Sequence, residues 1–289
     1  MQEGRIDKER VPNTGALSSP LLPAPPLPAR LLPTWAGNLR RAWGRWGWPL
    51  LGLLILLGCW PLASLLLGAE IFPGPVATLE FLRAEALRGA LWGHVGITLW
   101  RVLTSFALAL LLGVPLGWLL GNRPWLSALL APWLAVGLTL PRILIMLVAY
   151  LLIGLNERAL VVAITLILLP TAAVQVREGL RSLDPRLSEM ARAFRVPAGR
   201  QWRTVTLPQL TPTLLGTARV TLSLAWKMVV FGEVFGRTSG VGYMISFYFQ
   251  QFEMRGILAY GLVMTLILSG IDYGLAALGE RAFRWRGKA

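Results

Sequence analysis

Long uninterrupted blocks of apolar residues alternate with short polar segments along this chain. Five blocks run from Leu50 to Leu67, Ile97 to Leu120, Ala159 to Val176, Leu210 to Phe235 and Ile257 to Leu278. An α-helix rises about 1.5 Å per residue and the hydrocarbon core of a bilayer is about 30 Å thick, so about 20 residues cross it. Each block therefore predicts a transmembrane helix.

A sixth apolar stretch, from Leu126 to Ile153, is too long for one straight span. Pro132 and Pro141-Arg142 interrupt it, and proline disrupts the helical hydrogen-bond ladder. We predict an interfacial or bent piece, followed by a span from about Pro141 to Leu155. The fold class is then an all-α, polytopic transmembrane bundle of about six spans, with residues 69–96 and 236–255 as loops.

Residues 1–46 differ from the rest of the chain, because they are polar and then rich in proline. Such a segment cannot bury a core, so we predict a disordered cytoplasmic tail ahead of a membrane domain over 47–289. A PxxP ligand is the alternative, and a plain linker is favoured over it. The first apolar block starts too late for a cleavable signal peptide.

Charge is scarce and unevenly placed. Charged residues make up 15% of the chain, against about 25% in soluble domains, and the net charge is +14. Arginines concentrate in the N-terminal tail, at Arg123, in segment 177–208 and in the C-terminal tail, whereas acidic residues offset them in 69–96. This asymmetry predicts that both termini are cytoplasmic, and an even number of spans agrees. It also makes nucleic-acid binding a poor explanation of the positive charge.

The residues that catalysis, metal binding or nucleotide binding would need are few. His94 is the only histidine and Cys59 the only cysteine, so a Cys-based metal site and an internal disulfide are excluded. No G-x-x-x-x-G-K-[ST] phosphate loop is present. We expect no catalytic, cofactor-binding or metal-binding residues. A membrane-embedded enzyme remains an alternative that a hydrolysis assay would test.

Segment 177–208, on the predicted cytoplasmic side, contains a short amphipathic helix. Asp184-Pro185 is typical of a helix start, with Asp at the N-cap and Pro at the first helical position. The apolar side chains that follow fall at i, i+3, i+4 and i+7, on one face: Leu187, Met190, Ala191 and Phe194. Pro197 and Gly199 are expected to end the helix. The alternative is a surface helix that packs on the bundle or touches anionic lipid.

Two motifs in this segment resemble a known family. Glu189-Met-Ala191 and Val205-Thr-Leu207-Pro208 are similar to the signature loop of ABC importer permeases, with the same total spacing. The resemblance covers about residues 90–280 and is nearest to nitrate/sulfonate/taurine-type permeases. Arg195 stands where the family has Gly, and Met190 where it has the first Ala. Pro197 and Gly199 are expected to make the turn slightly later.

The resemblance implies a type I (MetI-like) importer permease in the cell inner membrane, with a coupling helix at about 184–200 that docks on a separate ATPase. It implies a second permease chain, expected to be an identical copy, and a periplasmic or lipid-anchored substrate-binding protein. ATP and Mg would bind the ATPase, not this chain. Nitrate, sulfonates, taurine, bicarbonate and a thiamine precursor all stay open as substrates. The ATPase-coupling residues implied are Asp184, Pro185, Leu187, Glu189, Met190, Ala191, Phe194, Arg195, Val205, Leu207 and Pro208.

Ionisable residues inside spans are costly and therefore point to function. Lys227 and Glu233 in the fifth span are candidates for the translocation pathway, where a cation would suit a small anion. A structural pair of Lys227 with Glu233 or Asp272 is the alternative. Three arginines nearer to span ends are expected to snorkel to the interface: Arg101, Arg142 and Arg219. A secondary transporter would need buried ion ligands and usually internal repeats; no clear repeat is seen, and co-purification with an ATPase would decide.

Overall fold

The computed structural model describes residues 47–282, and they are helical almost throughout. The predicted disordered tail 1–46 lies outside the described residues. The chain divides into two compact units at Leu57, within α2 (Trp48–Leu67), so the second unit begins at Gly58. The other helices, all in the second unit, are α3 (Pro75–Arg88), α4 (Ala90–Asn122), α5 (Pro124–Thr139), α6 (Arg142–Ile153), α7 (Glu157–Arg181), α8 (Pro185–Ala193), α9 (Ala198–Gln201), the π-helical turn η2 (Trp202–Thr206), α10 (Leu207–Gly236), α11 (Val241–Gln250) and α12 (Met254–Ala282).

Five helical stretches among the described residues are long and apolar enough to cross a membrane. They are α2, α4, α7, Ala198–Gly236 (α9 through α10) and Met254–Ala277 of α12. The bent pair α5–α6 makes up to six if it is counted as one span. The predicted all-helical bundle of about six spans is confirmed.

The bend between α5 and α6 is 95° and falls at Leu140–Pro141. Leu140 has an extended backbone (ψ 136°), the conformation that a following proline imposes on its neighbour. The prediction that Pro132 also interrupts this stretch was wrong, because Pro132 lies inside α5. One proline removes one backbone donor, and membrane helices tolerate this where neighbouring groups compensate.

Two segments predicted as loops contain helices instead. Within 69–96, α3 begins at Pro75, a residue suited to the first helical position, and ends at Gly89 with φ 83°. Gly89 lets the chain turn directly into α4. Within 236–255, α11 follows Gly240. The prediction failed because both helices, of 14 and 10 residues, are too short to form a membrane-spanning apolar block.

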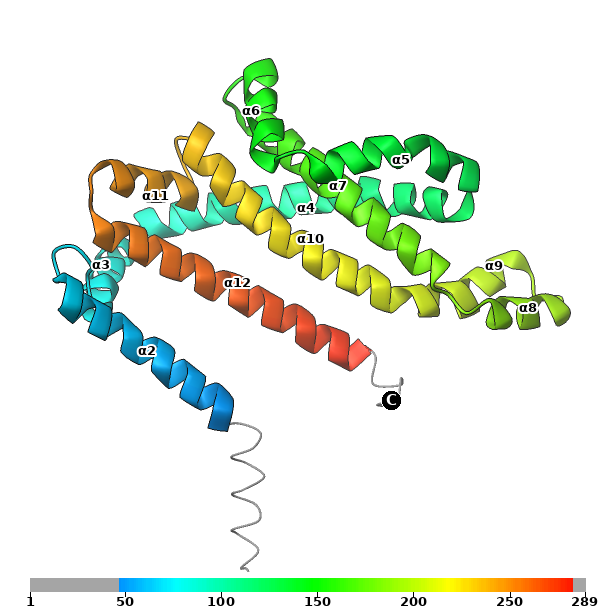
Figure 1. The fold of residues 1–289 in the computed structure, drawn as a ribbon, viewed down its shortest axis with the longest axis horizontal. Helices are drawn as coiled ribbons and strands as arrows, with labels where there is room; N and C mark the ends of the chain where they lie inside the picture. Colours follow the sequence, from blue (N-terminus) through cyan, green and yellow to red (C-terminus); the bar gives the residue numbers. More distant parts are fainter. Residues whose placement is uncertain (1–46, 283–289) are drawn as a thin grey trace, which may run out of the picture. The chain divides into compact units, whose positions relative to one another are not determined.

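The contact between α4 and α7 is the most extensive one in the second unit, and the two helices lie side by side in Figure 1. Gly113, Gly117 and Gly121 are spaced at i, i+4 and i+8 on α4. A Cβ at Gly113 would meet the Ala172 side chain at 2.8 Å, and one at Gly117 would collide with the backbone of α7. Small residues at this spacing let helix backbones approach closely in a membrane.

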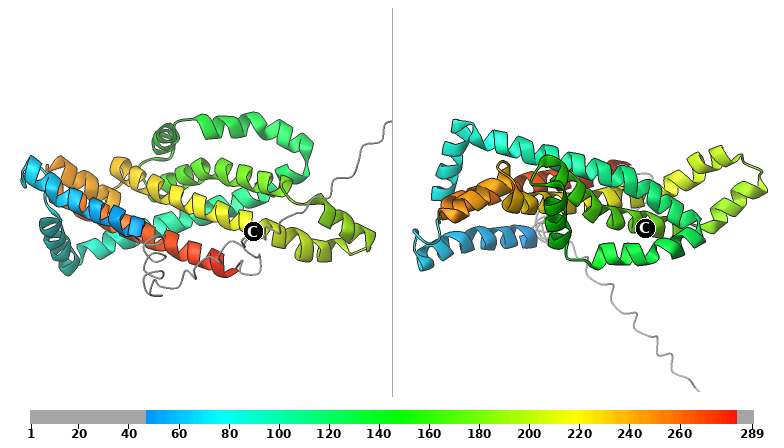
Figure 2. Two further views of the ribbon diagram at one scale, coloured as in Figure 1. Left: turned by 60° about the horizontal axis from the view of Figure 1, so that its bottom comes forward. Right: turned by 90° about the horizontal axis from the view of Figure 1, so that it is seen from above.

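The main buried core lies where α7 meets α4, α6 and α10. Trp226 of α10 is only 2% exposed and belongs to this core. Both ends of α10 have distinct neighbours. Its first residues continue from α8, α9 and η2, a hairpin that projects beyond the ends of α4 and α7 (Figure 2), while its last residues approach α4 and α11.

Candidate functional site

Helix α8 begins as the sequence predicts. The Asp184 carboxylate accepts a hydrogen bond from the Arg186 backbone N–H at 2.9 Å, and Pro185 occupies the first helical position. The Asp184 backbone N–H in turn donates to Oε1 of Gln209 at 3.0 Å, which joins the start of α8 to the start of α10. An N-cap of this kind contributes roughly 1 kcal/mol to helix stability, so α8 is defined locally.

One residue of the predicted apolar face of α8 is buried, and the other three are exposed. Ala191 is 3% exposed and holds the helix against the rest of the hairpin. Leu187, Met190 and Phe194 are 39%, 51% and 78% exposed. Glu189 is exposed as well. Three large apolar side chains on one projecting helix form a surface that another molecule can cover, and this set is called the α8 apolar face below.

The turn after α8 is made by Arg195 itself, so the expectation of a later turn at Pro197 and Gly199 was wrong. Arg195 has φ 51°, in the left-handed region. Its backbone N–H donates to Arg192 O at 2.9 Å, and the Val196 N–H donates to Ala191 O at 2.9 Å. These two bonds form a Schellman motif, in which glycine is the usual residue at the left-handed position. The backbone at position 195 therefore has the left-handed conformation that glycine usually adopts, although the residue is an arginine.

Replacing Arg195 by Gly is expected to stabilise this turn by about 0.5–1 kcal/mol, because a side chain in the left-handed region costs roughly 1–2 kcal/mol and glycine's extra unfolded-state entropy offsets part of the gain. In this variant, hydrogen exchange of the backbone amides at positions 195 and 196 should slow by about threefold. Arg195→Val, a β-branched control, should accelerate it. Equal amide exchange rates in the Gly and Val variants would show that a side chain at position 195 does not strain the turn.

The chain returns to the membrane through α9 and η2. The Trp202 ring packs edge-on against Trp118 at the end of α4, with ring centroids 6.1 Å apart. Val205 is partly buried in η2, and Leu207 and Pro208 open α10. The hairpin is thus attached to two membrane helices, and α10 runs without a break from it to the opposite end of the fold.

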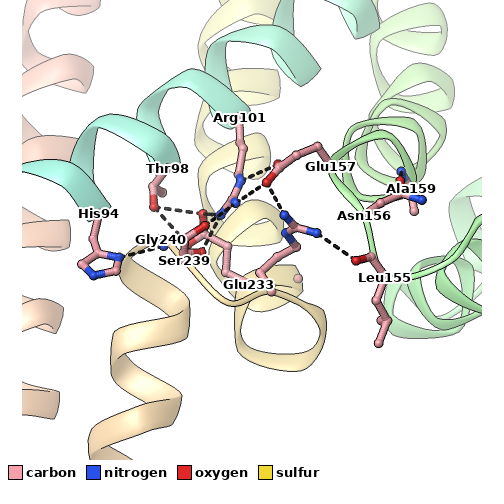
Figure 3. Close-up of polar contacts among 12 residues, drawn as sticks. His94, Thr98, Arg101, Leu155, Asn156, Glu157, Ala159, Glu233, Ser239 and Gly240 are labelled. Carbon is pink, nitrogen blue, oxygen red and sulfur yellow. Dashed lines mark hydrogen bonds and ion pairs between the residues drawn. The ribbon is translucent and has the colours of Figure 1, made fainter.

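At that opposite end, Arg101 of α4 is 1% exposed and binds two carboxylates (Figure 3). Its Nη1 lies 2.6 Å from Oε1 of Glu233, and its Nε and Nη2 lie 2.8 and 2.6 Å from the two oxygens of Glu157. Ser239 accepts two further bonds, through its carbonyl oxygen at 2.7 Å and its hydroxyl at 2.9 Å. Every guanidinium nitrogen of Arg101 is therefore used.

Glu233 of α10 is fully buried, and both of its oxygens have partners. The Thr98 hydroxyl lies 2.9 and 3.0 Å from them, and the Gly242 N–H donates at 2.9 Å. Gly240 has φ 107°, and a Cβ there would collide with the Glu233 carboxylate. The Gly240 N–H donates to Nδ1 of His94 at 3.0 Å, which gives the only histidine a structural role.

Arg237, just after α10, completes the cluster. It donates to Glu157 and, at 3.0 Å, to the carbonyl oxygen of Leu155. The Arg101 charge cluster, which consists of Arg101, Glu157, Glu233 and Arg237, thereby ties α4, α7, α10 and the loop before α11 together (Figure 3). A buried charge persists only when it is paired and hydrogen-bonded in this way.

Several expectations for the intramembrane charges were wrong. Arg101 does not snorkel, since it is buried and paired. Glu233 pairs with Arg101 rather than with Lys227, and Asp272 pairs with Arg219 at 2.6 Å. Lys227 is exposed and has no ion pair among the described side chains of residues 47–277. Two cluster members, Glu157 and Arg237, were not predicted from the sequence, because only the fold brings them together with Arg101.

Among residues 47–282, five apolar helical stretches, a bent helical pair and a projecting amphipathic hairpin form the architecture of a polytopic membrane protein. The family model described as "Binding-protein-dependent transport system inner membrane component" matches residues 113–283. The chain belongs to this family, and it is a membrane-spanning permease subunit of an ATP-binding-cassette importer.

Two relatives and one solved structure agree with this assignment. The chain is 29% identical to the putative aliphatic sulfonates transport permease SsuC of Bacillus subtilis, over 84% of this chain and 89% of that one. It is 26% identical to the taurine transport permease TauC of Escherichia coli, over 84% and 94%. An inward-facing structure of the MetNI methionine ABC transporter has the same fold, with a TM-score of 0.59, 20% identity, and coverage of 71% of this chain and 99% of that chain.

Proposed function

We propose that this permease imports a small anionic solute by alternating access, and that α8 is the helix through which separate ATPase subunits drive it. The observation that carries the proposal is the α8 apolar face. Leu187, Met190 and Phe194 stay exposed on a helix that is capped at both ends. A helix shaped by its own sequence, with its largest apolar side chains left uncovered, suits a cleft on another protein.

The connection from α8 to the membrane supports a lever mechanism. Gln209 holds the start of α8 to α10, and the Trp118–Trp202 contact holds the hairpin to α4. The other end of α10 is fixed to α4 and α7 by the Arg101 charge cluster. When ATP brings two ATPases together, displacement of α8 would be passed to α10 and change which side of the membrane the pathway faces.

The remaining parts of the proposal follow from the family and the charge pattern. SsuC and TauC are named for sulfonates and taurine, which supports a sulfonate-type or related small anion as the solute. Two identical permease chains, two ATPases and a periplasmic or lipid-anchored binding protein would form the transporter. The ATPases would hold ATP and Mg, and this chain would bind no cofactor. Both termini and α8 would be cytoplasmic, on the arginine-rich side.

Crosslinking from Glu189 tests the docking. In a Cys59→Ser background, which removes the only native cysteine, Glu189→Cys is expected to crosslink to the ATPase subunit, with a yield that changes between nucleotide-free and ATP-bound states. The matched control is Arg83→Cys, exposed on α3 in the segment assigned to the other side of the membrane. Crosslinks at position 83, or none at position 189 in any state, would overturn the proposal.

A further inference from the structure

Lys227 is an exposed cation deep within a membrane helix. It lies nine residues before Gly236, the last residue of α10, which places it about 14 Å from that end of the helix. With a hydrocarbon core about 30 Å thick, Lys227 is near the middle of the bilayer. A lipid phosphate group lies at the membrane surface, so it is too far away to be the partner of this ammonium group.

A charge facing lipid at that depth is costly, and such residues normally face a cavity, water or another protein group. Among the described side chains of residues 58–277, no carboxylate neutralises Lys227, because Glu233 is bound by Arg101 and Asp272 by Arg219. The Trp226 ring beside it points into the core. The ammonium group is therefore available to a ligand.

The face of α10 that carries Lys227 continues from Gly216 to Val234. Residues on this face follow one another at alternating steps of four and three, which keeps them on one side of an α-helix. The stripe consists of Gly216, Val220, Ser223, Lys227, Val230 and Val234. Three hollows follow it in order, lined in turn by Gly216 and Val220, by Lys227 and Val230, and by Val234.

The stripe has the character expected of a passage for an anion. Its side chains are small or short apart from Lys227, and it carries no carboxylate. The hollow at Lys227 has a volume of about 290 Å³, bounded on the other side by Met264, Thr265 and Leu268 of α12. A water molecule occupies about 30 Å³, so a small oxyanion with several waters fits. In the hollow lined by Gly216 and Val220, the Glu178 carboxylate is neutralised by Arg177 and Arg181.

We propose that this stripe of α10 lines the translocation pathway, and that Lys227 is the charge that binds the transported oxyanion midway across the membrane. The second permease copy would cover the open side of the three hollows along this stripe. This inference rests on the proposed import of an anion and adds the residue that selects for negative charge. The attraction of the ammonium group for an oxyanion near the middle of the bilayer supplies the selectivity.

Charged thiol reagents test the pathway in the assembled transporter with its ATPase. In the Cys59→Ser background, Ser223→Cys places a thiol one helical turn from Lys227 on the stripe. The probes are 2-sulfonatoethyl methanethiosulfonate, a sulfonate anion, and the cationic 2-(trimethylammonium)ethyl methanethiosulfonate, with each rate normalised to a free thiol. We expect the anion to be favoured about tenfold, equal to about 1.4 kcal/mol. Lys227→Met should remove this preference and Lys227→Arg should keep it.

Ala225→Cys, on the fully buried face of the same helix, should react with neither probe. If the thiol at position 223 reacts with neither probe in any nucleotide state, the stripe does not line an aqueous path. A preference that Lys227→Met leaves unchanged would show that Lys227 does not attract the anion. Crosslinking at Glu189 in the same preparation separates these outcomes from a failure of the importer assignment itself.

Discussion

Arg101→Met is expected to lower the free energy of unfolding by about 3–5 kcal/mol, the typical cost of removing one partner from a buried ion pair. The loss follows from what remains, because the Glu233 carboxyl group would be left at 0% exposure without a cationic partner, with only Thr98 and Gly242 as hydrogen-bond partners. Glu157 would lose its bidentate contact as well. Unfolding of the purified permease in detergent, followed by fluorescence of its 13 tryptophans, measures the change.

An exposed ion pair provides the matched control. Arg219 and Asp272 form an equally short bidentate contact at 2.6 and 2.7 Å, but their side chains are 48% and 42% exposed. Arg219→Met should therefore cost no more than about 1 kcal/mol. The double variant Arg101→Met with Glu233→Met should be more stable than the sum of the two single losses predicts, because it leaves less unpaired charge. Equal losses in the Arg101 and Arg219 variants would refute the role of burial.

Phe194→Asp is expected to reduce ATP-driven uptake at least tenfold while leaving the fold intact. The ring is 78% exposed in the permease alone, so the free energy of unfolding should change by less than about 0.5 kcal/mol. In the assembled transporter, the same side chain is proposed to fill a cleft of the ATPase. A carboxylate buried there without a partner weakens association by at least about 1.4 kcal/mol, which is tenfold. Co-purification of the ATPase and uptake into vesicles measure both effects.

Phe252→Asp is the matched control for this variant. Phe252 is 92% exposed and lies between α11 and α12, in the segment predicted to face the opposite side of the membrane. Its replacement should leave ATPase association unchanged, and Phe194→Leu should retain most of the uptake. If Phe194→Asp still binds the ATPase and transports at the normal rate, α8 does not form the coupling contact.

The membrane-crossing helices could be read from the sequence because their signal is local and strong. A run of about 20 apolar residues has one stable arrangement in a bilayer, whatever its neighbours are. Helix α8 was equally readable, since Asp184, Pro185 and the apolar spacing act within a few residues. The close packing of α4 on α7 also has a local sequence signal, the small-residue spacing of Gly113, Gly117 and Gly121.

Pairing of charges could not be read in this way. Glu157 and Glu233 lie 56 and 132 positions after Arg101 in the sequence, and any of several acidic residues could have been the partner of Arg101. The sequence analysis considered Lys227 with Glu233 or Asp272, and the fold instead joins Arg101 to Glu233 and Arg219 to Asp272. Which partners meet depends on how helices rotate and pack, and no local pattern carries that information.

By itself, the amino-acid sequence determined the helical class, the approximate spans, the bend near Pro141 and the amphipathic helix between two of them. These features depend on hydrophobic length, proline geometry and capping, which act over one or two turns. Only the tertiary structure decided that Arg101 is buried between two carboxylates and that Lys227 stays unpaired on an open face. Those outcomes depend on contacts between distant helices, where burial decides whether a charge needs a partner.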